Sequence, residues 1–346
     1  MNKKPFGLNI GIASIKAVWL SSLKEGFLLD ASIISPAPPK GMLSESPLDE
    51  EEMARAIGTA VENAKIISKF VNVALPENQV YTKVIEMPML SDKELSSAIF
   101  WEAEQNIPVS LSSITLAWNV LKRPKKTIGN EKMHVLMVGA PTMLVNKYQK
   151  VLSMAGLHIN ALETELLSII RALVLSENFP PSIIINIGSV STSLTIVQDG
   201  IMIFTYSIST GGIAINRAIS ADFGLTQIQA EEYKKNYGIS KEAFGGKIGK
   251  AIEPILNSIL AEVKKSLVFY SEKYKNDKPI RQILLTGGSA KLLGIDLFFA
   301  NNTNIETATV NPWKIVLNQK ELPQEVLDNG PDYTIAVGLA MRDNEN

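Results

Sequence analysis

The sequence predicts a two-lobed α/β protein with a small inserted subdomain, and three observations lead to this fold class. The chain has 346 residues, which suits two lobes because single hydrophobic cores stop growing near ~250–300 residues. Segments of strand, glycine and strand occur at residues 6–20 and again at residues 183–206. Strand-like and helix-like runs alternate through most of the remaining sequence. We therefore expect two lobes that each open with a hairpin.

The composition is that of a globular protein and excludes several classes of function. Lys and Arg total 34 and Asp and Glu total 35, so no long-range electrostatic field favours a nucleic-acid partner. The chain contains no cysteine, which excludes disulfides, thiol catalysis and cysteine metal sites. No apolar run reaches the ~18 residues of a membrane-spanning helix, and no secretory leader precedes the first strand. We expect a cytoplasmic protein without direct membrane insertion.

The first lobe is expected to comprise residues 1–70 and 157–181, closed by a C-terminal helix at 332–342. After the opening hairpin, a connection rich in proline and glycine leads to a helix that begins at Leu48. The acidic residues that follow Leu48 favour a helix N-terminus, because they complement the helix dipole there.

Residues 71–156 alternate with their own rhythm and are expected to form the insertion. Two strand-like runs precede a helix at 91–106, and two more precede a helix at 142–155. This order predicts a β-β-α-β-β-α subdomain.

Residues 182–331 are expected to form the second lobe. A hairpin opens it, a helical subdomain occupies about 225–278, and a buried strand at 280–286 leads into Gly287 and Gly288. A short helix or turn after these glycines would place Lys291 near the same point.

The first motif with chemical meaning is Leu8-Asn9-Ile10-Gly11-Ile12-Ala13-Ser14-Ile15-Lys16. A tight hairpin with glycine at its bend exposes backbone N–H groups that can bind phosphate oxygens. Ser14 adds a hydroxyl donor and Lys16 a positive charge. Taken alone, an ordinary hairpin with a surface lysine explains the segment as well.

The second hairpin repeats this order of residue types around Asn186, Gly188 and Thr192. Two such turns in different lobes can bind a polyphosphate from opposite sides. The repetition favours phosphate binding over coincidence.

Two further segments fit the same site. Gly211 and Gly212 follow the second hairpin and provide another backbone turn that could meet phosphate. Glu231 and Lys234 share one face of a helix, because residues three apart are neighbours on a helix surface. An exposed ion pair remains the alternative explanation for that spacing.

Together and in this order, the segments resemble the actin-like (ribonuclease H-like) ATPase superfamily of actin, Hsp70 chaperones, sugar kinases, FtsA and PilM. Within it, the chain is similar to the PilM family of type IV pilus assembly proteins over nearly its whole length, from about Gly7 to Arg342. Val73-Ala74-Leu75-Pro76 and Val84-Ile85-Glu86-Met87-Pro88 match the insertion of that family. The most specific segment is Trp101-Glu102-Ala103-Glu104-Gln105-Asn106-Ile107-Pro108.

The resemblance implies that ATP or ADP binds between the lobes. It implies a phosphate-binding role for Gly11, Ser14, Lys16, Asn186, Gly188 and Thr192. It also places Gly287 and Gly288 beside the adenosine, with Glu231 and Lys234 near the ribose and base. Gly211, Gly212 and Lys291 complete the expected nucleotide-binding set, and Glu165 would orient the attacking water.

One departure from the family pattern bears on catalysis. Asn9 and Asn186 stand where the superfamily usually has acidic residues, which help to hold the water shell of Mg²⁺. Asparagine keeps an oxygen but removes the negative charge, so any Mg²⁺ contact would be weak and water-mediated. Because phosphoryl transfer depends on charge neutralisation by the metal, we expect slow or absent hydrolysis. The sequence thus indicates a nucleotide-binding scaffold more than an efficient ATPase.

The helix at 91–106 is the expected partner-binding element. At about 100° per residue, Phe100 and Glu102 fall within the apolar arc of this helix, while Trp101 and Gln105 lie to one side. An internal ion pair with a lysine or arginine would explain Glu102, and so would a binding role shared with Trp101 and Gln105.

The resemblance implies that a PilN-like membrane protein is the partner, through its cytoplasmic N-terminal peptide. Such a partner would recruit the chain to the inner face of the cytoplasmic membrane. Contacts with other pilus platform or motor proteins, and self-association, are left open.

Three alternatives remain. An FtsA-like cell-division protein would carry a C-terminal amphipathic membrane helix, which this sequence does not show. A phosphotransferase such as a sugar kinase would need the acidic residues that Asn9 and Asn186 replace. A subunit of a related secretion or competence system cannot be separated from a pilus protein by sequence.

Overall fold

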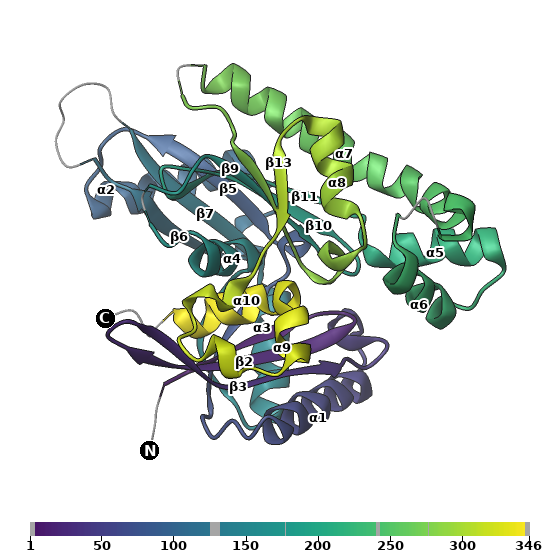
Figure 1. Ribbon diagram of the computed structural model, residues 1–346. Helices are drawn as coiled ribbons and strands as arrows, with labels where there is room; N and C mark the ends of the chain where they lie inside the picture. Colours follow the sequence, from purple (N-terminus) through teal and green to yellow (C-terminus); the bar gives the residue numbers. More distant parts are fainter. Residues whose placement is uncertain (1–3, 125–131, 177, 240–242, 276, 343–346) are drawn as a thin grey trace.

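The computed structural model describes residues 4–124, 132–176, 178–239, 243–275 and 277–342, and it has the two-lobed α/β architecture predicted from the sequence (Figure 1). Each lobe is built on a five-stranded sheet, and a third sheet of three strands forms the insertion.

The first sheet has the strand order β3-β2-β1-β4-β8. Its antiparallel part comes from consecutive hairpins, and β4 and β8 are added in parallel. Four helices flank the sheet. The elements are β1 (Phe6–Ile10), β2 (Ser14–Leu23), β3 (Gly26–Pro36), β4 (Phe70–Leu75), β8 (His158–Thr164), α1 (Pro47–Asn63), α3 (Thr142–Met154), α4 (Glu165–Leu173) and α10 (Gly330–Met341).

One face of this sheet packs on α1 and α3 and the other on α10. Phe6, Leu8 and Met53 belong to the first of these cores, and Val18 and Val337 to the second. A Cβ atom at Gly7 would lie 2.0 Å from the backbone oxygen of Ala336, so β1 and α10 approach too closely for any larger residue.

The second sheet has the matching order β11-β10-β9-β12-β13. As in the first sheet, two antiparallel pairings are followed by two parallel ones, which is the structural counterpart of the repeated hairpins. The elements of this lobe are β9 (Ser182–Ile187), β10 (Thr192–Gln198), β11 (Ile201–Ile208), β12 (Gln282–Thr286), β13 (Glu306–Thr309), α5 (Gly212–Phe223), α6 (Gln227–Tyr237), α7 (Lys247–Lys273) and α8 (Ile295–Thr303).

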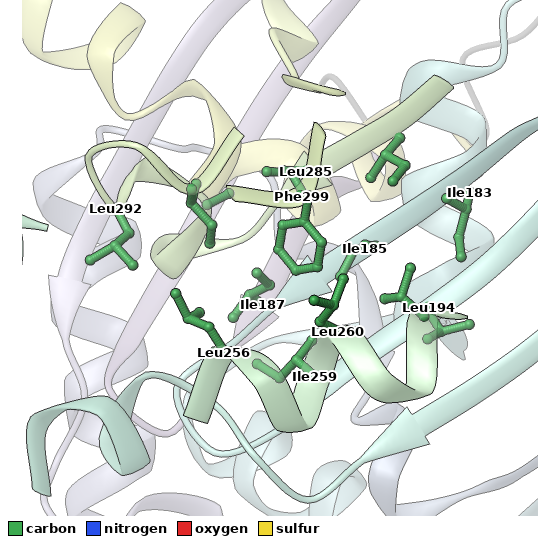
Figure 2. Packing of buried hydrophobic residues seen from close by; sticks show 14 of the residues in the cluster. Ile183, Ile185, Ile187, Leu194, Leu256, Ile259, Leu260, Leu285, Leu292 and Phe299 are labelled. Carbon is green, nitrogen blue, oxygen red and sulfur yellow. The ribbon is translucent and has the colours of Figure 1, made fainter. Parts of the chain in front are cut away.

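The core of the second lobe lies between this sheet and its helices (Figure 2). Isoleucines of β9 face Phe299 of α8 and Leu256 of α7, and all of these side chains are buried. Burial of each such side chain contributes roughly 1.5–3 kcal/mol, so this core holds the β9–β10 hairpin in place.

The insertion consists of β5 (Tyr81–Met87), α2 (Asp92–Asn106), β6 (Ile114–Lys122) and β7 (Met133–Pro141), with the strand order β5-β7-β6. Helix α2 packs Leu95, Ile99 and Ala103 onto one face of this sheet. The Ser91 side chain and Glu94 form a capping box that fixes the start of α2.

The packing differs from the expected domain boundaries at three elements. Strand β4, expected in the insertion, pairs with β1 and β8, and α3 packs on α1. Trp313, expected in the second lobe, packs with Val18 and Leu20 of the first. These differences arise because sheet pairing and long-range packing cannot be read from local periodicity. The insertion sheet and its helix therefore run in the order β5-α2-β6-β7.

The remaining elements are short. They are η1 (Gly41–Leu43), η2 (Glu77–Gln79), η3 (Leu111–Ser113), η4 (Ala243–Gly246), η5 (Gly288–Lys291), η6 (Pro312–Ile315), η7 (Gln319–Glu321) and α9 (Gln324–Asp328). Across the described ranges, none of the helices combines the length and the apolar content needed to cross a membrane.

Candidate functional site

The two predicted phosphate-binding turns have the same backbone geometry. In the first, Asn9 faces Lys16 across the β1–β2 pairing, and the backbone N–H of Gly11 donates to the backbone oxygen of Ser14 at 3.0 Å. In the second, Asn186 faces Ser193, and the N–H of Gly188 donates to the oxygen of Ser191 at 2.9 Å. The sequence repeat is therefore also a repeat of turn structure.

Charged side chains gather around the first turn. Lys16 lies among Glu165 of α4, Asp332 of α10 and Lys291 of η5, which all affect its ionisation. Burial lowers the pKa of Lys16, and the two carboxylates act against that shift. Lys291 is held in place by an ion pair with Asp332 at 2.7 Å and by the side chain of Asn329. The first turn thus presents an ammonium group within a network that spans both lobes.

The second turn is held by the start of α5. The backbone N–H of Gly212 donates to the oxygen of Gly188 at 2.9 Å, and that of Ile213 donates to the oxygen of Ser189 at 2.8 Å. The Thr192 hydroxyl donates to the oxygen of Thr210 at 2.8 Å. The amides of Gly212 and Ile213 therefore hold the second turn in place.

Gly211 is required at this contact by close approach. A Cβ atom there would lie 2.6 Å from the backbone oxygen of Gly188 and 2.8 Å from the backbone nitrogen of Ser191. Such distances are shorter than van der Waals contact, so a larger residue would push the turn away from α5.

The predicted Glu231–Lys234 pair lies beside the start of α5. The two side chains form an ion pair at 2.5 Å, and the Asn216 amide donates to the same Glu231 carboxylate at 2.7 Å. A Cβ atom on Gly212 would lie 2.6 Å from the Ser289 hydroxyl and 3.2 Å from the Lys234 ammonium. Burial lowers the pKa of Lys234, while Glu231 acts to raise it. Lys234 and Ser289 therefore converge on the second turn from different helices.

Gly287 directly follows β12 and lies against Asn186 and Ile187, just before the second turn. Its φ of +86° is in the region that favours glycine, and a Cβ atom would lie 2.6 Å from Oδ1 of Asn186. The N–H of Gly287 also donates to the oxygen of Pro331 at 3.0 Å, which joins this turn to the start of α10. Gly288 follows, and a Cβ there would lie 3.0 Å from the Asp332 carboxylate.

Glu165 begins α4 and accepts a hydrogen bond from the backbone N–H of Glu77 at 3.4 Å. Burial raises the pKa of Glu165 to about 7, although that N–H and Lys16 favour its charged form. A carboxyl group that titrates near neutral pH can accept a proton from water, which is what an attacking-water role would require.

The residues fit a nucleotide better than they fit a tightly held metal. Lys16 and Lys234 offer positive charge to phosphate beside the two glycine turns, whose shape is fixed by their own backbone hydrogen bonds. Within the described ranges, no group of three or more His, Cys, Asp or Glu side chains is placed to hold a metal ion. Any Mg²⁺ at Asn9 and Asn186 would depend on phosphate oxygens and water.

The candidate site is defined by these converging groups and not by the two surface grooves that follow α1. Both grooves are lined by Gly58 and Ala155, together with residues of α1, of α3 and of the segments that follow these helices, and none of the predicted nucleotide-binding residues lines them.

The predicted partner-binding residues lie apart from this site, on α2 of the insertion. Trp101 is 58% exposed and its neighbour Phe100, expected on the apolar arc, is 51% exposed. Glu102 is half-buried and accepts a hydrogen bond from the Asn106 amide at 3.1 Å. Among the described residues Glu102 has no ion pair, and its side-chain partner is the amide of Asn106.

Sequence reasoning missed Asp332, Ser289 and Glu77. Asp332 follows Pro331 in the first turn of α10, a position where proline and acidic residues together indicate a helix start. Glu77 directly follows the Val-Ala-Leu-Pro segment that the family resemblance used, so its proximity in sequence was the available signal.

Comparisons with known proteins identify the family and the fold. A family model described as "Type IV pilus assembly protein PilM" matches residues 7–344. A solved structure titled "PilM-PilN type IV pilus biogenesis complex" is similar with a TM-score of 0.87 and 26% identity, and the alignment covers 99% of each chain.

More distant relatives share the fold. The chain is 24% identical over 322 residues to cell division protein FtsA of Streptococcus pneumoniae, covering 83% of this chain and 69% of that protein. The structure of MreB5 of Spiroplasma citri bound to ADP is similar with a TM-score of 0.51 and 14% identity, covering 97% of this chain and 95% of that one. These similarities identify the actin-like fold that the sequence predicted.

Proposed function

The chain belongs to the PilM family of type IV pilus assembly proteins, and we propose that it is an actin-like scaffold that docks the cytoplasmic N-terminal peptide of a PilN-like membrane protein. The observation that carries the proposal is the similarity to the PilM-PilN complex over 99% of both chains. The similarity extends over the insertion that carries α2.

The exposed face of α2 supports a docking role. Phe100 and Trp101 are consecutive aromatic residues of α2, and both side chains are more than half exposed. Aromatic residues with one apolar face and one polar edge dominate the energy of many interfaces. Half-buried Glu102 beside them offers a carboxylate to a polar or basic group of the peptide.

We further propose that ATP or ADP binds between the two glycine turns. Lys16 would contact phosphate from the first lobe, with Lys291 close to it. Gly188 and Thr192 would shape the second turn, and Lys234, Glu231, Gly287 and Gly288 would lie near the nucleoside. With Asn9 and Asn186 in place of carboxylates, Mg²⁺ would bind weakly and hydrolysis would be slow or absent.

A partner of this kind would also determine where the protein works. A membrane protein that presents its N-terminal peptide in the cytoplasm would hold the chain at the inner face of the cytoplasmic membrane.

The test uses a fluorescent synthetic peptide with the N-terminal sequence of the PilN-like protein. Its affinity for the chain is measured from the change in fluorescence anisotropy. We expect Trp101→Ala to weaken binding at least tenfold, about 1.4 kcal/mol, as for an interface hot spot. Trp118→Ala is the matched control, because Trp118 is 37% exposed on β6 of the same insertion. It should change the affinity less than about twofold, as expected for a residue outside the hot spot.

The outcomes separate the parts of the proposal. Equal affinity of wild type and Trp101→Ala would exclude the α2 face as the docking surface. Absence of peptide binding by the wild type would exclude the scaffold function. Binding of a peptide from a secretion or competence system with higher affinity would favour the related assembly, and binding of a peptide from a cell-division protein would favour the FtsA-like alternative.

A further inference from the structure

Glu77 is a buried carboxyl group without a hydrogen-bonding partner among the described residues. It lies in η2, its residue is 5% exposed, and neither of its carboxylate oxygens makes a hydrogen bond. The hydroxyls of Thr82 and Thr164 and the backbone N–H of Leu166 lie near it and favour its charged form, but the carboxylate oxygens make no hydrogen bond of ordinary geometry with them. Because an unpaired buried carboxylate is costly, this group needs either a proton or a positive charge beside it.

A second carboxyl group lies next to it. The backbone N–H of Glu77 donates to Oε2 of Glu165 at 3.4 Å, and the charge of the Glu165 carboxylate disfavours ionisation of Glu77. The Tyr148 side chain of α3 lies near Glu165, and its hydroxyl is buried without a partner among the described residues. The buried cluster therefore consists of side-chain oxygens from η2, α3 and α4.

Among the described residues, Lys16 provides the one ammonium group that acts on this pair of carboxyl groups. Lys16 attracts Glu165, and no described cation is among the groups that act on Glu77. Lys291, the next cation beyond Lys16, is already paired with Asp332 at 2.7 Å. Two carboxylates beside one lysine leave one negative charge uncompensated in a buried place, and two like charges so close disfavour full ionisation.

We propose that Glu77 and Glu165 act as one acid pair that holds a single proton near neutral pH. In this pair Glu77 is a positioning residue, since its N–H and its neutral carboxyl keep the Glu165 carboxylate directed toward Lys16. Lys16 lies on the first phosphate-binding turn, so the pair lies directly behind the proposed nucleotide site.

The location of the pair gives it a mechanical role. The η2 turn joins β4 of the first lobe to β5 of the insertion, and Thr82 beside Glu77 is on β5. The Thr205 hydroxyl of β11 donates to the backbone oxygen of Thr82 at 3.3 Å. The pair therefore lies where both lobes meet the insertion that carries α2. A change in the charge of the pair would change the contacts at this junction.

The titration of the pair has a definite sign. Burial raises the pKa of both Glu77 and Glu165 to about 7, above their ordinary value of 4.5. The folded protein then binds a proton that the unfolded chain releases. Stability must fall as pH rises from about 4.5 to about 7 and stay low above that range.

The first test is thermal unfolding of the full chain without nucleotide at about pH 5 and about pH 8. We expect Glu77→Gln to unfold at a temperature roughly 5 °C higher than wild type at about pH 8, and at nearly the same temperature at about pH 5. The neutral amide replaces the protonated carboxyl, so it removes the penalty that wild type meets at high pH.

Glu50→Gln is the matched control, because Glu50 is a first-lobe glutamate that is 8% exposed but paired with Lys150 at 2.7 Å. It should lower the unfolding temperature at both pH values. The proposal is overturned if Glu77→Gln behaves like this control. It is also overturned if added Mg²⁺ or Ca²⁺ abolishes the pH dependence of wild type, since the pair would then hold a metal ion and not a proton.

The second test concerns the link to nucleotide and rests on the proposed function. Phosphates that draw Lys16 away from Glu165 should make the pair bind its proton more tightly. Calorimetry of ATP binding near pH 7 in buffers of different ionisation enthalpy should therefore show more proton uptake by wild type than by Glu77→Gln. Equal uptake would overturn the link. Absence of ATP binding would refute the nucleotide site while the first test still decides the acid pair.

Discussion

The two glycine hairpins have one backbone design but different surroundings. In each, an asparagine stands two residues before a glycine whose N–H closes the turn. The position across from the asparagine is Lys16 in the first hairpin and Ser193 in the second. Lys16 is surrounded by ionisable groups, whereas the second turn is tied by backbone hydrogen bonds to α5. The comparison indicates that the first turn supplies charge and the second supplies shape.

This division explains why loss of the two acidic residues need not abolish nucleotide binding. A turn that binds by shape depends on glycine and on its supporting helix, and a turn that binds by charge depends on one lysine. Neither requires a carboxylate, which serves the metal. The following experiments test the division, from the largest expected effect to the smallest.

Lys16→Met should have the largest effect on nucleotide affinity. Removal of the ammonium group on the first turn should weaken ATP binding by about 2–3 kcal/mol, as for a charged hydrogen bond, measured by calorimetry. Lys250→Met, at an exposed position on α7, is the control and should leave the affinity unchanged. Similar affinities of both variants would mean that the first turn does not supply the charge.

Gly211→Ala should disturb the second turn through its shape. The added Cβ would meet the backbone of Gly188 and Ser191 at 2.6 and 2.8 Å, and overpacking of this kind costs roughly 1–3 kcal/mol. Urea unfolding should show this loss of stability, with weaker ATP binding. Gly58→Ala in α1 is matched, because its Cβ would meet no atom within 4 Å. The free energy of unfolding of that variant should rise by roughly 0.5–1 kcal/mol. A loss of stability in both variants would point to a general effect of alanine.

Asn9→Asp and Asn186→Asp make the same change at equivalent positions and should differ. The carboxylate introduced by Asn9→Asp would face Lys16, so this variant should fold normally and bind ATP about tenfold more tightly in Mg²⁺ than in EDTA. Asn186 lies between Ser193 and Gly287, where no described cation contacts it, so Asn186→Asp should lower stability. Calorimetry and thermal unfolding measure the two effects. Identical behaviour of the variants would remove the distinction between the hairpins.

The exposed rings of α2 illustrate what the sequence could and could not predict. The helix and its apolar positions Leu95, Ile99 and Ala103 follow from periodicity, because every third or fourth side chain faces the sheet. The same periodicity placed Phe100 on the apolar arc of the helix, yet the Phe100 side chain is exposed. The width of the arc that a helix buries is set by the sheet beneath it, which the helix sequence does not contain.

The sequence by itself determined the two hairpins with their glycines, Gly287 and Gly288 after the later strand, and the family to which the chain belongs. These follow from residues near each other in the chain, because glycine, hydroxyl residues and strand-forming residues have local conformational preferences.

The tertiary structure decided which charges face the first turn. Asp332, Lys291 and Glu165 come from three separate elements that meet only when α10 packs between the lobes. It also decided that Glu77 is buried beside Glu165 without a partner for its carboxylate oxygens among the described residues. Burial and electrostatic coupling depend on atoms brought together from distant parts of the chain, so they exist only after the two lobes and the insertion have packed.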